Sequence, residues 1–182
     1  MKVYNKGRIS EMKNKENAGF TLVELIIVII ILGILAALAI PQFSTSTKDA
    51  EEATLQANLA TMRSSGNLYY HQHGSDYPGA IKVDGSGTAT VGADNPVAFT
   101  DQMVQYTAKD GETSANLDRV NFPFGTYYQQ GLPNNPILNF NTVMVIDQVT
   151  PIIAADTDQS TGWIFNKATG ELRANDTNYL SF

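Results

Sequence analysis

Hydrophobic and polar positions divide the 182-residue chain into three parts. Residues 25–40 are sixteen successive positions without a polar side chain. The residues before this run are polar and basic, and those after Pro41 have the Asn-, Asp-, Ser-, Thr- and Gly-rich composition of a water-soluble domain. The pattern therefore predicts a leader, an apolar segment and a globular remainder.

The apolar segment has the length of a membrane-spanning helix. Residues 20–40 would extend about 31 Å as an α-helix, which matches the hydrocarbon thickness of a bilayer. Residues 1–19 carry five basic and two acidic side chains, and such a basic flank favours a cytoplasmic start. On length and hydropathy alone, a single-pass membrane anchor explains the segment.

Helical periodicity continues beyond Pro41. Leu55, Leu59, Met62 and then Tyr69 or Tyr70 form one apolar stripe at helical spacing. We therefore expect one helix of about fifty residues that ends near Gly74, with its second half packed on a sheet. The following region is rich in turn signals, and one short helix is expected over residues 97–108.

The C-terminal region is expected to form a small antiparallel sheet. Residues 142–146 and 152–154 are strand candidates, while 162–165 and 171–174 predict a hairpin with Trp163 in the core. The fold class is therefore α+β, with a long N-terminal helix packed on this sheet. The expected segments are a leader (1–19), a transmembrane or filament-core helix (20–41), the amphipathic half of the same helix (42–74), an irregular connection (75–141) and the sheet (142–182).

Charge and composition exclude several classes of function. The chain has a formal charge of −6, and residues 20–182 carry seven basic and sixteen acidic side chains, which disfavours nucleic acid as a partner. The absence of cysteine excludes disulfides and thiol catalysis. No nucleotide-binding or nucleophile motif is present, so we expect no enzyme. His71 and His73 point apart on a helix, which favours a solvated helix end over a metal site.

Glu24 is a carboxylate near the start of the apolar run, where a charge is unfavourable without a partner. No basic side chain lies between Phe20 and Phe43. Cleavage after Gly19 would give Phe20 a free α-amino group, a cation with a usual pKa of about 8. This amine lies about one helical turn from Glu24 in the same chain, and it can pair with Glu24 of a neighbouring copy. Glu24 is therefore expected to favour assembly.

The sequence GFTLVE at residues 19–24, followed by the apolar run, resembles the class III signal of type IV prepilins and type II secretion pseudopilins. In that family a prepilin peptidase cuts after the glycine and methylates the new N-terminal phenylalanine. The resemblance implies cleavage between Gly19 and Phe20, N-methylation of Phe20, and an assembly role for Glu24. A nineteen-residue leader is long for this group, and a start at Met12 would give an ordinary one.

Gly33 and Pro41 match the helix-loosening glycine and the terminal proline of the family. Glycine costs about 1 kcal/mol relative to alanine inside a helix, and proline removes a backbone donor. Residues 33–41 are therefore the easiest part of the helix to unwind in a filament. For a monomer in a bilayer, a mild kink at Pro41 is the simpler expectation.

The resemblance implies a structural subunit of a helical homo-oligomeric filament, with no cofactor. Its partners would be prepilin peptidase, inner-membrane assembly machinery and minor pilins or pseudopilins. It would reside in the bacterial inner membrane as a single-pass precursor, and then in an extracellular pilus or a periplasmic pseudopilus. A major-type pseudopilin of a type II secretion system is one alternative. A membrane-anchored binding domain that never polymerises is the second.

Calcium is the one ligand that the sequence suggests. Asp156 and Asp158 offer oxygen atoms in a loop of the predicted sheet region, at a spacing found early in calcium-binding loops. Major pseudopilins of type II secretion bind calcium in a similar place. The full acidic set of those proteins is missing here, and a solvated turn is the alternative.

Overall fold

The structure is a computed structural model that describes residues 19–182. The predicted leader, apart from Gly19, and the alternative start at Met12 lie outside the described residues. The chain divides into two compact units, one that ends at Thr45 and one that comprises Ser46–Phe182. The two units are described separately below.

Helix α1 (Leu22–Gln72) begins in the first unit and contains the apolar run. Residues 25–38 are all exposed, so this part of the helix is apolar all round and no other described residue covers it. Such a helix belongs in a membrane or in the core of a larger assembly. By length and composition, α1 is the one described helix that is able to cross a membrane.

The second half of α1 carries the predicted apolar stripe. Its buried positions recur every three or four residues, which places them on one face of the helix. The helix ends at Gln72, and Gly74 follows with a φ of 72°, a left-handed conformation typical of a residue after a helix. The predicted stripe and helix end are confirmed. The buried positions are Leu55, Leu59, Met62, Gly66, Tyr69 and His73.

A short helix lies in the long connection, as predicted, but with different bounds. Helix α2 (Asn95–Val104) ends before residue 108 because Gln105 is extended and the next two residues form strand β1 (Tyr106–Thr107). Strand β1 pairs antiparallel with β2 (Thr113–Ser114). The buried side chain of Gln102 in α2 accepts from the N–H of Gly79 and donates to Ile81 O and Gly111 O, which fixes the preceding and following loops to the helix.

The C-terminal sheet has three strands in the order β3 (Val143–Ile146), β4 (Trp163–Asn166) and β5 (Glu171–Ala174). The predicted β4–β5 hairpin and the strand at β3 are confirmed. Strands β4 and β5 are antiparallel, but β3 runs parallel to β4, so the sheet is mixed rather than wholly antiparallel. The α+β fold class holds.

The strand expected over residues 152–154 is wrong. Ile152 is buried, but its N–H donates to the Glu171 carboxylate at 2.8 Å instead of joining a strand. The N–H of Ile153 donates to Asp156 at 2.9 Å, and a 3-10 turn, η1 (Ala154–Asp156), follows. Carboxylates therefore take the backbone hydrogen bonds that a neighbouring strand would have taken. A second 3-10 turn, η2 (Thr177–Tyr179), lies near the C-terminal end.

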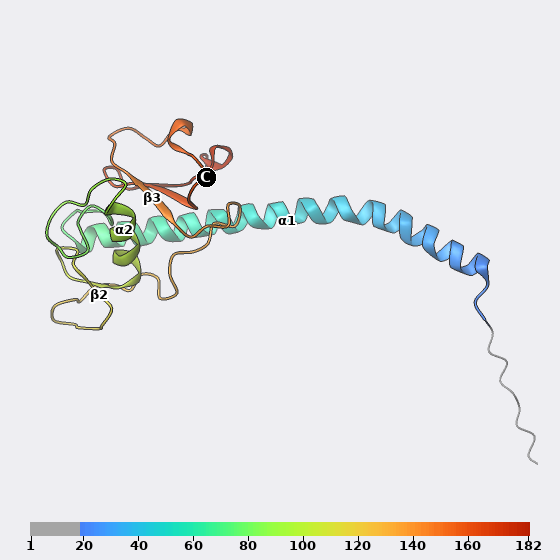
Figure 1. Ribbon diagram of the computed structural model, residues 1–182, viewed down its shortest axis with the longest axis horizontal. Helices are drawn as coiled ribbons and strands as arrows, with labels where there is room; N and C mark the ends of the chain where they lie inside the picture. The colour runs from blue at the N-terminus through green and yellow to red at the C-terminus, as the bar shows by residue number, and fades with distance from the viewer. Residues whose placement is uncertain (1–18) are drawn as a thin grey trace, which may run out of the picture. The chain divides into compact units, whose positions relative to one another are not determined.

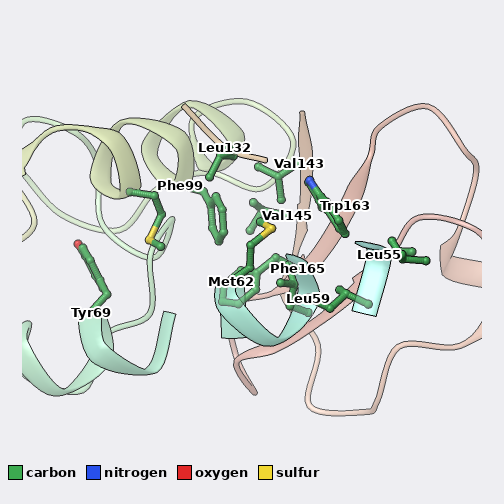
Figure 2. Close-up of a cluster of buried hydrophobic side chains, with 13 residues drawn as sticks. Leu55, Leu59, Met62, Tyr69, Phe99, Leu132, Val143, Val145, Trp163 and Phe165 are labelled. Carbon is green, nitrogen blue, oxygen red and sulfur yellow. The ribbon is translucent and has the colours of Figure 1, made fainter. Parts of the chain in front are cut away.

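The hydrophobic core lies between the second half of α1, α2 and the sheet (Figure 1). Figure 2 shows Met62 of α1 beside Val145 and Phe165 of the sheet. Trp163 is fully buried, as predicted, and its indole N–H donates to Pro133 O at 2.9 Å. This bond satisfies the one polar atom of the side chain, so the tryptophan joins the core without an unpaired donor.

Candidate functional site

The predicted cleavage junction lies in exposed, non-helical chain. Gly19 and Phe20 precede the helix, which begins at Leu22, and the side chain of Phe20 is 83% exposed. A peptidase must bind its substrate in an extended form, and the hydrogen bonds of a helix would prevent this. The junction is therefore outside the helix and accessible, and its processing stays a prediction.

Glu24 is bound to Thr21 by hydrogen bonds at the start of α1. The carboxylate Oε2 of Glu24 accepts from the backbone N–H of Thr21 at 2.9 Å and from its hydroxyl at 2.8 Å. The hydroxyl oxygen of Thr21 in turn accepts from the N–H of Glu24 at 3.2 Å. This reciprocal arrangement is a capping box, which satisfies backbone donors that the first helical turn leaves unpaired.

The capping box gives Glu24 a role within its own chain. From its place in the apolar run the carboxylate was expected to need a cation, but Thr21 is a partner within the same helical turn. A threonine three residues before a glutamate, ahead of an apolar run, is the sequence signal for a capping box, and Thr21 is therefore the site residue that was missed. A carboxylate at a helix N-terminus also interacts favourably with the helix dipole.

Gly33 and Pro41 both lie inside α1, and the helix is continuous through them. A side chain at Gly33 would meet no atom within 4 Å, so nothing in the described chain requires a glycine there. The loosening role of this stretch stays a prediction. The structure places Gly33 on the helix surface, free for contact with another molecule.

Several small side chains lie on the outward face of α1 between residues 53 and 61, beside the exposed side chain of Gln56. Ala53, Ala57 and Ala60 are exposed, and two exposed threonines lie among them. The hydroxyls of Thr54 and Thr61 donate to the carbonyl oxygens four residues earlier, at 2.8 and 2.9 Å. The hydroxyls of these two threonines are therefore engaged within their own helix, and the surface between residues 53 and 61 presents mainly methyl groups.

The two histidines point apart, as helical geometry predicts, but only one is solvated. His71 is exposed, whereas His73 is 3% exposed and stacks on the ring of Tyr69 with centroids 3.7 Å apart. His73 Nδ1 lies 2.8 Å from Tyr69 O and Nε2 lies 2.9 Å from the Thr107 hydroxyl. The expectation of a solvated helix end is therefore wrong for His73, because its ring joins the core.

Asp156 and Asp158 lie in the turn between β3 and β4, and each is engaged locally. Asp156 Oδ2 accepts from Ile153 N–H and from the Gln148 amide. Asp158 Oδ1 accepts from the N–H and hydroxyl of Ser160 and from the Asn175 amide. Among residues 19–182 no group of three or more His, Cys, Asp or Glu side chains is placed to hold a metal. The calcium site stays a prediction.

Comparison with known proteins locates the strongest similarity at the N-terminal segment. The family described as "Prokaryotic N-terminal methylation motif" matches residues 14–40, a range that contains Gly19, Phe20, Glu24 and Gly33. The Type IV narrow pilus major component PilA5 of Thermus thermophilus is 51% identical over 47 residues, which are 26% of this chain and 40% of that protein.

Two further relatives are also similar to the chain. The Type IV major pilin protein PilA of Myxococcus xanthus is 27% identical over 153 residues, which are 82% of this chain and 64% of that protein. The Type II secretion system core protein G of Pseudomonas aeruginosa is 33% identical over 58 residues, which are 32% of this chain and 41% of that protein. The chain thus spans less than two thirds of each relative's length.

No solved structure shows a significant match to the chain. The sequence comparisons confirm the resemblance to type IV pilins and type II secretion pseudopilins that the sequence GFTLVE predicts.

Proposed function

We propose that this chain is a structural subunit of a type IV pilin-like filament, made as a membrane-anchored precursor and matured by cleavage before Phe20. The observation that carries the proposal is the match of residues 14–40 to the N-terminal methylation motif, together with an apolar helical segment that no other part of residues 19–182 covers. A helix apolar on every side is stable in a membrane or among other copies, and a filament subunit needs both environments in turn.

The outward face of α1 supports assembly beyond the apolar run. Between residues 53 and 61, small side chains allow another helix to approach closely, and the hydroxyls of Thr54 and Thr61 already donate within α1. A single-pass anchor with a monomeric soluble domain has no need of such a face. The face therefore favours the polymerising subunit over the non-polymerising anchored domain.

Maturation is tested by intact mass and N-terminal sequencing of the protein extracted from membranes. A chain that begins at Phe20 and carries one additional methyl group is the expected result. A chain that retains residues before Phe20 would contradict the proposal, and the simple membrane anchor would replace it.

Glu24 is proposed to pair with the amine of Phe20 on a neighbouring copy. Glu24→Ala should leave cleavage intact and impair polymerisation. Because Glu24 also caps its own helix, two further variants separate the roles. Glu24→Gln keeps an oxygen that can accept from Thr21 but removes the charge, whereas Thr21→Val removes the capping hydroxyl and keeps the charge.

Filament yield by electron microscopy distinguishes these roles. Loss of filaments in Glu24→Gln with normal filaments in Thr21→Val would support the charge pair. Normal filaments in Glu24→Gln with loss in Thr21→Val would assign Glu24 to helix capping and remove its pairing role. Normal filaments in Glu24→Ala would remove both roles.

The kind of filament is a separate choice. We favour a pilus, because the relative whose match covers 153 residues of this chain is described as a type IV major pilin, whereas the match to the type II secretion protein covers 58 residues. Long filaments outside the cell are then expected. If the wild type has no such filaments and a deletion strain fails to export exoproteins, the chain would instead be assigned to a type II secretion pseudopilus. The match to a type II secretion core protein supports this alternative.

Calcium binding at Asp156 and Asp158 is supported by their place in one turn between two sheet strands. A rise in the thermal unfolding midpoint with added calcium, lost in Asp156→Ala, would establish the site. A midpoint that neither calcium nor a chelator changes would remove it.

A further inference from the structure

A groove of about 420 Å³ runs between α2 and the outer edge of β3, on the globular unit. Figure 1 shows these two elements side by side. Leu132 and Val143, both almost fully buried, lie at its base, and Val97 is 56% exposed at its rim. Val104 completes the apolar lining. An apolar hollow of this kind gains free energy when another apolar group displaces its water.

The groove also contains unpaired polar groups. Strand β3 is at the edge of the sheet, and Thr142 O accepts from Trp163 N–H of β4. Because successive residues of a strand direct their backbone groups to opposite sides, the N–H and C=O of Val143 face away from β4. Asp101 is the one charged residue in the lining, and its carboxylate has no ion pair or side-chain hydrogen bond in the described chain.

A tight turn at residues 117–120 has the complementary chemistry. Leu117 is 57% exposed and Val120 is 87% exposed, and Arg119 lies exposed between them without an ion pair to any described residue. The turn follows β2 in a loop that projects from the globular unit (Figure 1). It therefore presents two apolar side chains and one cation together.

The turn is held in one shape before it meets a partner. Asp118 Oδ1 accepts from the N–H groups of Val120 and Asn121 at 2.9 and 3.2 Å, and Oδ2 accepts from the Asn121 amide at 2.7 Å. The N–H of Phe122 donates to Asp118 O at 2.7 Å. A preformed turn loses little conformational entropy on binding, so more of the contact energy is available for association.

We infer that the 117–120 turn of one copy docks in the α2–β3 groove of the next copy, with Leu117 and Val120 against the apolar lining and Arg119 beside Asp101. No residue of the turn lines its own groove, and residues 19–182 leave the groove open. Turn and groove are different surfaces, and a contact between different surfaces repeats from copy to copy without closing on itself. The inference rests on the proposed filament function and names one of its contacts.

A charge swap in the full chain, expressed in its source bacterium, tests the ion pair. Arg119→Glu and Asp101→Arg each place like charges together, and each should reduce filament yield about tenfold or more. The double variant restores the attraction and should recover most of the yield. Wild-type yield in both single variants, or no recovery in the double variant, would overturn the pairing of these residues.

Disulfide crosslinking tests the contact directly, because the chain has no cysteine of its own. The pair Val97→Cys and Val120→Cys should give a ladder of dimers, trimers and larger species on mild oxidation. The matched control pairs Val97→Cys with Val149→Cys, since Val149 is an apolar residue 89% exposed on another loop. The control should give no ladder.

Filaments counted in the same preparations separate this inference from the proposed function. Filaments without a ladder, or an equal ladder from the control, would overturn the docking contact and leave the filament proposal standing. A ladder without filaments would support the contact and count against the filament. Absence of both the ladder and the filaments would count against the docking contact and against the filament proposal.

Discussion

Stability of the globular unit is predicted to depend on the protonation of His73. The ring is almost completely buried, and its Nδ1–H donates to Tyr69 O while Nε2 accepts from the Thr107 hydroxyl. A carbonyl only accepts, so in the neutral ring the proton is on Nδ1; a second proton on Nε2 would reverse the bond to the Thr107 hydroxyl and place a positive charge in a buried site. Burial lowers the pKa of His73, an effect that hydrogen bonding and the charges of Asp76 and Asp110 oppose in part.

The sign of the pH effect follows from this lowered pKa. The unfolded chain, in which histidine has a pKa of about 6.5, binds the proton more readily than the folded chain. Stability is therefore complete above about pH 6.5, falls as the pH drops towards the folded-state pKa, and levels off below it. One proton limits the slope to about 1.4 kcal/mol per pH unit.

The assay is urea unfolding of the full chain in detergent, at pH 7.5 and pH 5.5, followed by the fluorescence of Trp163, the single tryptophan. The wild type should lose up to about 1.4 kcal/mol between these two conditions. His73→Phe keeps a ring on Tyr69 but takes no proton, so its loss should be much smaller. His71→Gln, a change at the exposed histidine, should behave as the wild type.

Exposed carboxylates do not obscure this comparison. The N–H groups of Val120 and Ser160 hold the pKa values of Asp118 and Asp158 below their usual range, so both stay ionised at pH 5.5. An equal loss of stability in the wild type and in His73→Phe would refute the reasoning.

Two further predictions use matched pairs of variants in the same unfolding assay. Leu59→Ala, in the core, should lower the free energy of unfolding by about 2–5 kcal/mol. Leu68→Ala, at a half-exposed position on the same helix, should change it by about 0.5 kcal/mol or less. Equal effects of the two variants would contradict the assigned core. Gly170→Ala should lower the free energy of unfolding clearly more than Gly74→Ala. Both glycines have a positive φ, but only at Gly170 would the new methyl group overlap the Tyr77 ring. Similar losses at the two positions would show that backbone strain alone accounts for them.

Features that depend on neighbouring residues in the sequence were predicted well. The apolar run, the helix stripe through Leu55 and Leu59, and the β4–β5 hairpin each arise from a local periodicity or a short turn. The candidate site at Gly19, Phe20 and Glu24 also comes from one continuous segment, and its processing and assembly roles stay predictions. The capping partner of Glu24 also has a local sequence signal, a threonine three residues before the glutamate.

Features that depend on distant segments were not predicted. The parallel pairing of β3 with β4 depends on where the chain between them runs, and the periodicity of either strand is the same in both directions. Ile152 has the composition of a strand residue, yet the carboxylate of Glu171, nineteen positions away, takes its N–H.

The sequence by itself determined that the chain has a segment long and apolar enough to cross a membrane, where the chain is expected to be cut, and which helix face packs inward, because each of these follows from the order of neighbouring side chains. The tertiary structure decided that His73 is buried and His71 is not, and that a groove forms between α2 and β3. Burial and hollows depend on which distant residues fill the space around a side chain, and only the folded chain fixes that arrangement.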